Sequence, residues 1–334
     1  MRTFKVSVTA FVYLALFGAS ILRGADTHLP TGPTTIPIGG PGGWDCLSVD
    51  TVMHRLYVSH GTHVPIIDLD QNKVVGDIPG TPRVHAIAIA PEFGRGFISD
   101  GGDTTVTVFD LKTDSVIARV TVTGRNPDLI LYDPSSHRVF TFNGGGMNAT
   151  VIDAQSLKVL GTIPLDGKPE FAVSDYSGRV FVNIEDKSLV AVIDPVAMKV
   201  TATWPIAPAE EPSALVIDRA HHRLFTCAQN KLMAVLDTDS GRVITTVPIG
   251  TGVDGAAFDP ATQMVFSSNG EGTLTVIHED DPNTFSVLST LETARGARTM
   301  ALDERTHRLY LPVGTRPDST GVAKDDFRVL VYQE

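Results

Sequence analysis

The stretch HHRLF at residues 221–225 returns almost unchanged as HRLY at 54–57, HRVF at 137–140 and HRLY at 307–310. Each copy ends on an aromatic residue, and similar segments between them complete a column of seven: Tyr57, Phe97, Phe140, Phe181, Phe225, Phe266 and Tyr310. The successive spacings are 40, 43, 41, 44, 41 and 44 residues. The chain is therefore built from seven copies of a unit of about 42 residues.

Each unit has the texture of short β-strands. The third unit runs LILY, DPSSH, RVFTF, NGGGM, ATVID, AQSL and KVLGTIPL, so that β-branched and aromatic runs alternate with turns rich in Gly, Asn, Asp and Pro. Four such strands per unit, repeated seven times, predict an all-β fold: a seven-bladed β-propeller of four-stranded antiparallel blades occupying residues 26–334.

We call this His-Arg-apolar-aromatic segment the repeated word, and its composition has a structural explanation. An aspartate stands seven positions before the aromatic residue in five units, and histidine stands three positions before it in four. Aspartate at the start of a tight turn bonds its own backbone, and histidine or glycine at its end tolerates the left-handed conformation. We therefore assign His54, His137, His222 and His307 to turns.

These units resemble the YVTN-type (YncE-like) β-propeller repeat family. The first element of its pattern appears here as YVSH at 57 and FTFN at 140, and its V-x-V-I-D element places aspartates at Asp68, Asp110, Asp153, Asp194 and Asp237. The resemblance covers residues 33–334 and implies a propeller without a shared reaction or ligand. Unit 6 differs, because His278 stands where the aspartate is expected, and unit 7 ends at Tyr332 without a fourth strand.

The missing strand has a donor near the start of the chain. TTIPIGGPGG at 34–43 matches the last-strand sequence TTVPIGTGVDG at 245–255. We expect the N-terminal strand to complete the last blade and so remove its exposed edge. Closure also places Cys46 and Cys227 on nearly opposite sides of the ring, too far apart for a disulfide.

The N-terminus predicts export to the periplasm or the extracellular space. Arg2 and Lys5 precede an apolar run and small residues, which is typical of a signal peptide over residues 1–25, and an uncleaved signal anchor is the alternative. No other segment is apolar enough to span a membrane. Removal of residues 1–25 deletes three basic residues and no acidic one, so the net charge changes from −11 to −14.

The charge balance restricts the class of partner. No segment concentrates Lys and Arg, which argues against general affinity for nucleic acid or an anionic membrane surface. We expect a monomer whose partner is a small molecule or a protein.

The candidate ligand site comes from register. One position near the start of the first strand, twelve residues before the aromatic column and eleven in unit 4, faces the mouth of the central channel in every unit. It holds Asp45, His85, Asp128, Glu170, Ser213, Asp254 and Arg298. Converging carboxylates predict binding of a cation, and oxygen donors without cysteine favour a hard divalent ion such as calcium. Acids that merely cap strand ends in solvent are the alternative.

A second candidate is a metal site beside the ring. The segment HGTH supplies His60 and His63, and the neighbouring unit supplies Asp100 and Asp103 together with His85. Two imidazoles and carboxylates are ligands for a transition metal.

The final unit contains a longer loop, around residues 314–326, that we expect to form a lid or rim on the same face. Signatures of catalysis are missing from the sequence: it contains no G-x-S-x-G elbow and no phosphate loop. The sequence therefore favours a non-catalytic ligand-binding or protein-interaction scaffold. A metal-assisted, lactonase-like hydrolase at the channel mouth is the alternative.

Overall fold

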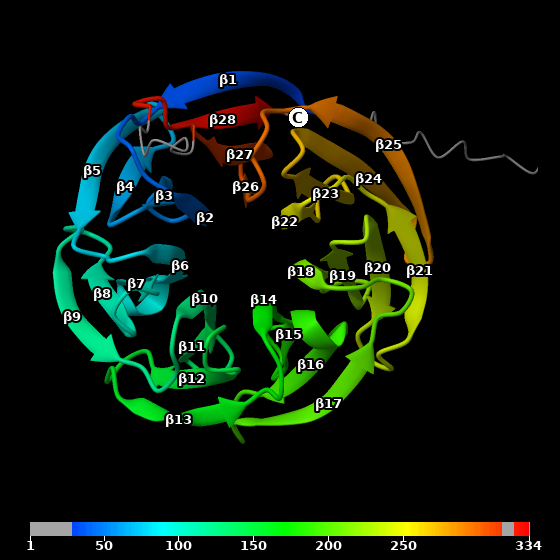
Figure 1. Cartoon of the computed structure of the whole chain (residues 1–334), viewed down its shortest axis with the longest axis horizontal. Helices are drawn as coiled ribbons and strands as arrows, with labels where there is room; N and C mark the ends of the chain where they lie inside the picture. The colour runs from blue at the N-terminus through cyan, green and yellow to red at the C-terminus, as the bar shows by residue number, and fades with distance from the viewer. Residues whose placement is uncertain (1–28, 316–323, 334) are drawn as a thin grey trace, which may run out of the picture.

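The computed structural model describes residues 29–315 and 324–333. Seven four-stranded antiparallel sheets stand around a central axis, in chain order, as the blades of a propeller (Figure 1). The predicted fold class is confirmed. The predicted signal peptide, residues 1–25, lies outside the described residues. Within the described residues no helix is long and apolar enough to cross a membrane.

In each of blades 1 to 6, four consecutive strands are arranged in chain order from the axis outward. Blade 1 comprises β2 (Trp44–Asp50), β3 (Arg55–His60), β4 (His63–Asp68) and β5 (Lys73–Pro79). Blade 2 comprises β6 (Val84–Ala90), β7 (Arg95–Asp100), β8 (Thr105–Asp110) and β9 (Val116–Thr121), with the 3-10 turn η1 (Pro91–Phe93). Blade 3 comprises β10 (Pro127–Asp133), β11 (Arg138–Asn143), β12 (Asn148–Asp153) and β13 (Val159–Pro164). Blade 4 comprises β14 (Pro169–Ser174), β15 (Val180–Ile184), β16 (Leu189–Asp194) and β17 (Lys199–Pro205), with η2 (Glu185–Lys187).

The ring is closed in blade 7, which follows blades 5 and 6. Blade 5 comprises β18 (Pro212–Asp218), β19 (Arg223–Ala228), β20 (Leu232–Asp237) and β21 (Val243–Pro248). Blade 6 comprises β22 (Val253–Asp259), β23 (Met264–Asn269), β24 (Thr273–Asp281) and β25 (Thr284–Glu292). Blade 7 comprises β26 (Ala301–Asp303), β27 (Arg308–Val313), β28 (Arg328–Gln333) and the N-terminal β1 (Thr31–Pro37). β1 pairs antiparallel with β28, as predicted, and gives blade 7 its outer strand.

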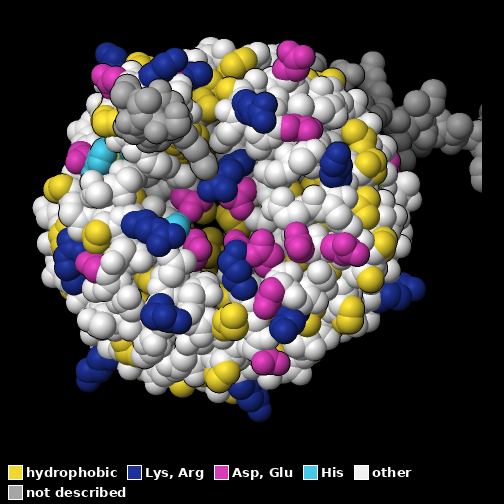
Figure 2. Space-filling view, viewed as in Figure 1, with side chains coloured by type: hydrophobic (Ala, Val, Ile, Leu, Met, Phe, Trp, Pro, Cys, Tyr) yellow, Lys and Arg dark blue, Asp and Glu magenta, His cyan; other side chains and the backbone are white. Residues whose placement is uncertain are grey.

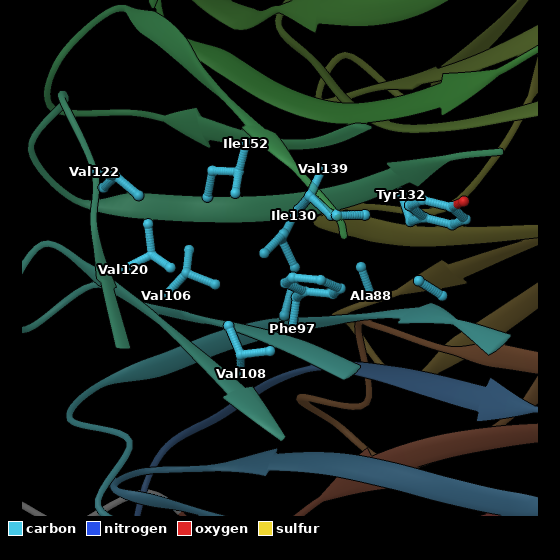
Figure 3. Close-up of a cluster of buried hydrophobic side chains, with 13 residues drawn as sticks. Ala88, Phe97, Val106, Val108, Val120, Val122, Ile130, Tyr132, Val139 and Ile152 are labelled. Atoms are coloured by element: carbon cyan, nitrogen blue, oxygen red, sulfur yellow. The ribbon is translucent and has the colours of Figure 1, made fainter. Parts of the chain in front are cut away.

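The core lies between neighbouring blades. All seven aromatic residues of the repeated column are on the second strand of their blade, and each is fully buried. Phe97 of β7 packs with Val106 and Val108 of its own blade and against Ile130 and Val139 of blade 3 (Figure 3). Each blade therefore contributes one face to each of two cores, and no blade can bury its apolar face alone.

The turn between the first two strands confirms the assignment of the repeated word. In blade 1 the carboxylate of Asp50 accepts hydrogen bonds from the backbone N–H groups of Val52 and Met53, at 2.9 and 3.0 Å. His54 closes the turn with φ of 51°, and His137, His222 and His307 have φ of 56°, 58° and 55°. These histidines occupy a left-handed position required by the turn.

In blades 1 to 5 the arginine two positions before the aromatic residue connects its blade to the next. Its guanidinium reaches the turn between the third and fourth strands of the following blade, where it meets main-chain carbonyls or, in blade 1, a carboxylate. The pairs are Arg55 with Asp114, Arg95 with Ala154, Arg138 with Val196, Arg179 with Thr238 and Arg223 with Pro282. This contact gives the repeated arginine a structural role in blades 1 to 5. In blade 7 the equivalent Arg308 instead donates to Gln333 of its own blade, at 2.6 Å.

Blade 6 has an extended outer hairpin. In blades 1 to 5 an aspartate ends the third strand; Asp68, for example, accepts hydrogen bonds from the N–H groups of Asp70 and Gln71. His278 replaces that aspartate, and β24 continues to Asp281, which accepts the hydrogen bond of the Asn283 N–H at 2.8 Å. The turn is displaced because the residue that would close it is absent.

The two cysteines are unpaired, as the repeat predicted. Cys46 lies on β2 of blade 1 and Cys227 on β19 of blade 5, and both are free thiols.

Candidate functional site

The ring of register-equivalent residues begins with strand geometry. Six of its members are the second residue of the innermost strand of their blade, and Arg298 lies just before β26. In all six strands the pairing with the second strand shifts at this point; in blade 1 the shift lies between Trp44 and Leu47. A bulge at a strand end re-aims the side chain that it carries.

All seven predicted ring residues line one cavity at the channel mouth. Its volume is about 340 Å³, and Lys168, Glu185 and Cys46 also line it. Figure 2 shows Asp and Glu side chains together with Lys, Arg and His around a central hollow on this face. The lining includes five carboxylates but only Lys168, Arg298 and the His85 imidazole to balance them. The mouth therefore carries an excess of negative charge. The role of these residues in binding stays a prediction.

His85 lies between two of the carboxylates. Its Nδ1 is 2.7 Å from Asp45 Oδ2 and 3.2 Å from Asp128 Oδ1. Burial opposes the charged imidazole, but the hydrogen bond to Asp45 and the charge of Asp128 outweigh it and raise the pKa of His85. A Cβ on Gly101 would lie 2.7 Å from His85 Nε2, so only glycine fits beside this ring.

A second group in the ring surrounds Arg298. Its Nη1 is 3.1 Å from Asp254 Oδ2 and its Nη2 is 3.7 Å from Asp45 Oδ1. The Ser213 hydroxyl donates to Asp254 Oδ1 at 2.5 Å. Burial raises the pKa of Asp254, and Arg298 opposes that rise. Arg298 of blade 7 therefore connects the acids of the two blades beside it, blades 6 and 1.

The third group contains two residues that the ring prediction missed. Lys168 Nζ lies 2.7 Å from Glu170 Oε1 and also donates to Glu185. Burial raises the pKa of Glu170 to about 8 in spite of Lys168. Lys168 stands two positions before the ring residue, where blade 2 has Arg83, so a second polar column was visible in the sequence. Glu185 starts η2, and no repeated pattern marked it.

The second predicted metal site is not assembled. The rings of His60 and His63 lie together with centroids 4.9 Å apart, but His60 is buried and stacks on Phe327 at 4.1 Å. Asp100 and Asp103 accept hydrogen bonds from Thr107 and Thr105 of their own blade, both at 2.6 Å. Among the described residues, the groups with three side chains placed to hold a metal include none of these four. Burial and the charge of His63 lower the pKa of His60 to about 4.

The predicted lid loop is described only at its ends. Residues 316–323 lie outside the described part of the chain. On one side Thr315 donates its backbone N–H to Asp326 Oδ1 at 2.7 Å, and on the other Asp325 accepts from the Gly40 N–H. Phe327 then packs on Trp44 at 5.7 Å. The loop therefore leaves and rejoins blade 7 beside the first strand of blade 1.

Comparison with known proteins supports the fold alone. A chain of Kuenenia stuttgartiensis hydrazine synthase matches with a TM-score of 0.73 and 15% identity, over 82% of this chain and 94% of that one. U3-55K matches with a TM-score of 0.73 and 10% identity, over 90% and 98%. The WD40 repeats of RRP9 match with a TM-score of 0.73 and 10% identity, over 91% and 100%. No family model and no curated protein matches the sequence. The chain has the β-propeller fold, which commonly serves as a binding scaffold, and these matches do not identify the YVTN-type family.

Proposed function

We propose that the protein is an exported, non-catalytic ligand-binding β-propeller of the YVTN (YncE-like) type whose channel mouth binds a small cationic ligand. The observation that carries the proposal is the cavity at the mouth: seven residues of one register line it, and carboxylates exceed cations there. The repeated word and the strand-ending aspartates support the family. The sequence of residues 1–25 supports export.

The electrostatics of the mouth favour a positively charged ligand. Burial raises the pKa of Asp128, Asp254 and Glu170, which means that each of these carboxylates is costly to ionise without a further cation. A bound cation would displace protons from this cluster and remove the repulsion between its acids. A ligand with one or more ammonium groups or a divalent ion meets this requirement.

A metal-assisted hydrolase of the lactonase type is the second candidate, and one observation favours it. Asp45, His85 and Asp128 each offer a ligand atom, and these atoms all lie within 4.8 Å of one another. The central imidazole suits zinc or manganese better than calcium, which prefers an all-oxygen set. A bound divalent ion would polarise a carbonyl oxygen of the substrate.

The test is binding of Ca²⁺, Mn²⁺ and spermidine, each measured by titration calorimetry with chelator-treated protein. We expect at least one of the three to bind the wild type, and Asp45→Ala with Asp128→Ala to weaken that binding tenfold or more. The circular dichroism spectrum should not change, because neither residue belongs to a blade core.

The control removes the same charge elsewhere. Asp70→Ala with Asp239→Ala takes two exposed acids from turns on the opposite face and should bind as the wild type does. Equal binding by the mouth variant and the control, or no binding of any probe to the wild type, would contradict the proposal. Turnover of γ-butyrolactone by the Mn²⁺-loaded wild type, lost in the mouth variant, would replace it with the hydrolase.

A further inference from the structure

Two irregularities of the repeat meet on the face opposite the channel mouth. The first is the extra histidine of HHRLF: His221 stands where the other copies of the word have Met53, Ser136 and Thr306. The second is the extended hairpin of blade 6, which brings Glu279 of β24 next to the first turn of blade 5. Neither residue is required by the repeat, and they lie in contact.

These residues form a compact group with the turn aspartate of blade 5. Asp218 uses Oδ1 to accept the Ala220 N–H at 2.8 Å, which leaves Oδ2 facing His221 Nδ1 at 2.6 Å. Glu279 Oε1 lies 3.4 Å from the same nitrogen. The three ligand atoms all lie within 4.8 Å of one another. Two carboxylates from different blades thus converge on one imidazole.

Glu279 is the unusual member of this group. Its side chain is 0% exposed, and neither carboxylate oxygen accepts a hydrogen bond from a donor group of the described residues. Its carboxyl lies beside that of Asp218, and the two can share a hydrogen bond only when one of them is protonated. Arg223 is close enough to lower its pKa, but its guanidinium donates to Pro282, Asp237 and Asn283 instead. A buried carboxylate without hydrogen bonds is unfavourable unless a proton or a cation neutralises it.

We propose that Asp218, His221 and Glu279 form a site for a divalent transition metal that joins blade 5 to blade 6. One imidazole and two carboxylates are the donors that zinc and manganese accept, and calcium is disfavoured by the imidazole. His221 is 39% exposed, so the metal reaches the site from solvent and water completes its coordination. The side chains need only open slightly, since ligand atoms around zinc stand about 3.3 Å apart.

The expected role of this site is structural. Its donors come from two blades, and Arg223 already makes the regular contact between the same two blades, to the turn of the same hairpin. A metal there would reinforce that contact where the longer hairpin of blade 6 leaves the repeated pattern. Because the site lies on the face away from the mouth, it shares no residue with the candidate ligand site.

The test uses Zn²⁺ as the probe in chelator-stripped protein carrying Asp45→Ala and Asp128→Ala, so that the mouth cannot supply a metal site. We expect one zinc per chain by calorimetry and elemental analysis, and a higher melting temperature with zinc. Adding His221→Ser or Glu279→Gln should weaken zinc binding tenfold or more and abolish the thermal shift. In a protein that keeps Asp45 and Asp128, His221→Ser should lower the zinc content by one ion per chain relative to the wild type.

The control is His222→Asn, which changes the neighbouring histidine of the same turn. Asparagine tolerates its left-handed backbone, with φ of 58°, and zinc binding should not change. His221→Ser should fold because Ser136 occupies the equivalent position in blade 3. The proposal is overturned if the mouth-disabled protein binds no zinc, or if His221→Ser and Glu279→Gln bind it as tightly as before. Neither result bears on cation binding at the mouth.

Discussion

Two clusters of two carboxylates and one imidazole lie on opposite faces of this propeller, and they differ in how their charges are balanced. At the mouth, Asp45, His85 and Asp128 come from one register of three successive blades, and Arg298 lies 3.7 Å from Asp45. On the other face, Asp218, His221 and Glu279 come from places where the repeat is broken. At the mouth a cation of the same register, Arg298, lies beside the carboxylates, whereas among the described residues no Lys or Arg forms an ion pair with Glu279.

The largest expected difference concerns Glu279. Burial, followed by the charge of Asp218, raises its pKa to about 8. Between its unfolded pKa and about 8 the folded protein holds a proton that the unfolded chain has lost, so the free energy of unfolding falls as pH rises through this window. Glu279→Gln should remove roughly 3 kcal/mol of that fall between about pH 5 and about pH 8, measured by urea unfolding with chelator present.

Glu170→Gln sharpens this measurement. The pKa of Glu170 is also raised to about 8, but Lys168 lies 2.7 Å from it. The fall in unfolding free energy with pH that Glu170 causes should remain in Glu279→Gln and disappear only in the double variant. Identical pH profiles for the wild type and Glu279→Gln would show that the buried carboxylate is not the unbalanced charge.

A smaller effect on the free energy of unfolding is expected at the mouth, where the substitution lowers stability. Arg298→Met leaves Asp254 buried without its cation, and unfolding free energy at neutral pH should fall by about 2 kcal/mol. The loss is less than for a fully enclosed pair because the guanidinium is 34% exposed. The matched control is Arg305→Met, which breaks an exposed pair with Asp70. If both variants lose the same stability in urea, the mouth charges are not paired as described.

The smallest effect tests whether the two clusters are electrically independent. Burial and the charges of Asp45 and Asp254 raise the pKa of the Cys46 thiol well above its usual range. Asp254→Asn should lower that pKa and speed alkylation of Cys46 by iodoacetamide roughly two- to tenfold. Glu279→Gln should leave the rate unchanged, and Cys227 is a poor competitor because burial raises its pKa to about 12. An equal acceleration in both variants would mean that the clusters share one field.

The sequence was sufficient for the fold and for the membership of the ring. A regular spacing of Tyr57 and its six counterparts places one aromatic residue in each blade, and a closed ring converts equal register into equal radius. The contacts within the ring were not predictable, because the bulge near Trp44 that aims Asp45 leaves no mark in the residue pattern. The stacking of His60 on Phe327 was not predictable either, because Phe327 comes from the other end of the chain.

Glu279 shows a different limit. His278 was visible as an irregularity in the sequence, and the absence of a turn-closing aspartate implies a longer strand. Where that strand ends depends on Asp281, and which side chain it carries to blade 5 depends on packing between blades. Such contacts are set by the neighbouring blade and leave no periodic signal.

The pairing of β1 with β28 also imposes a delay during biosynthesis, because the two strands lie at opposite ends of the propeller sequence. Thr34 of β1 pairs with Val331 of β28, which is made 297 residues later. At roughly 5–20 residues per second, β1 waits about 15 to 60 s for its partner. During that interval β1 has no sheet to join, and the blades made so far stand in an open arc with unpaired flanks. The nascent chain is therefore most vulnerable to aggregation and proteolysis just before its last strand appears.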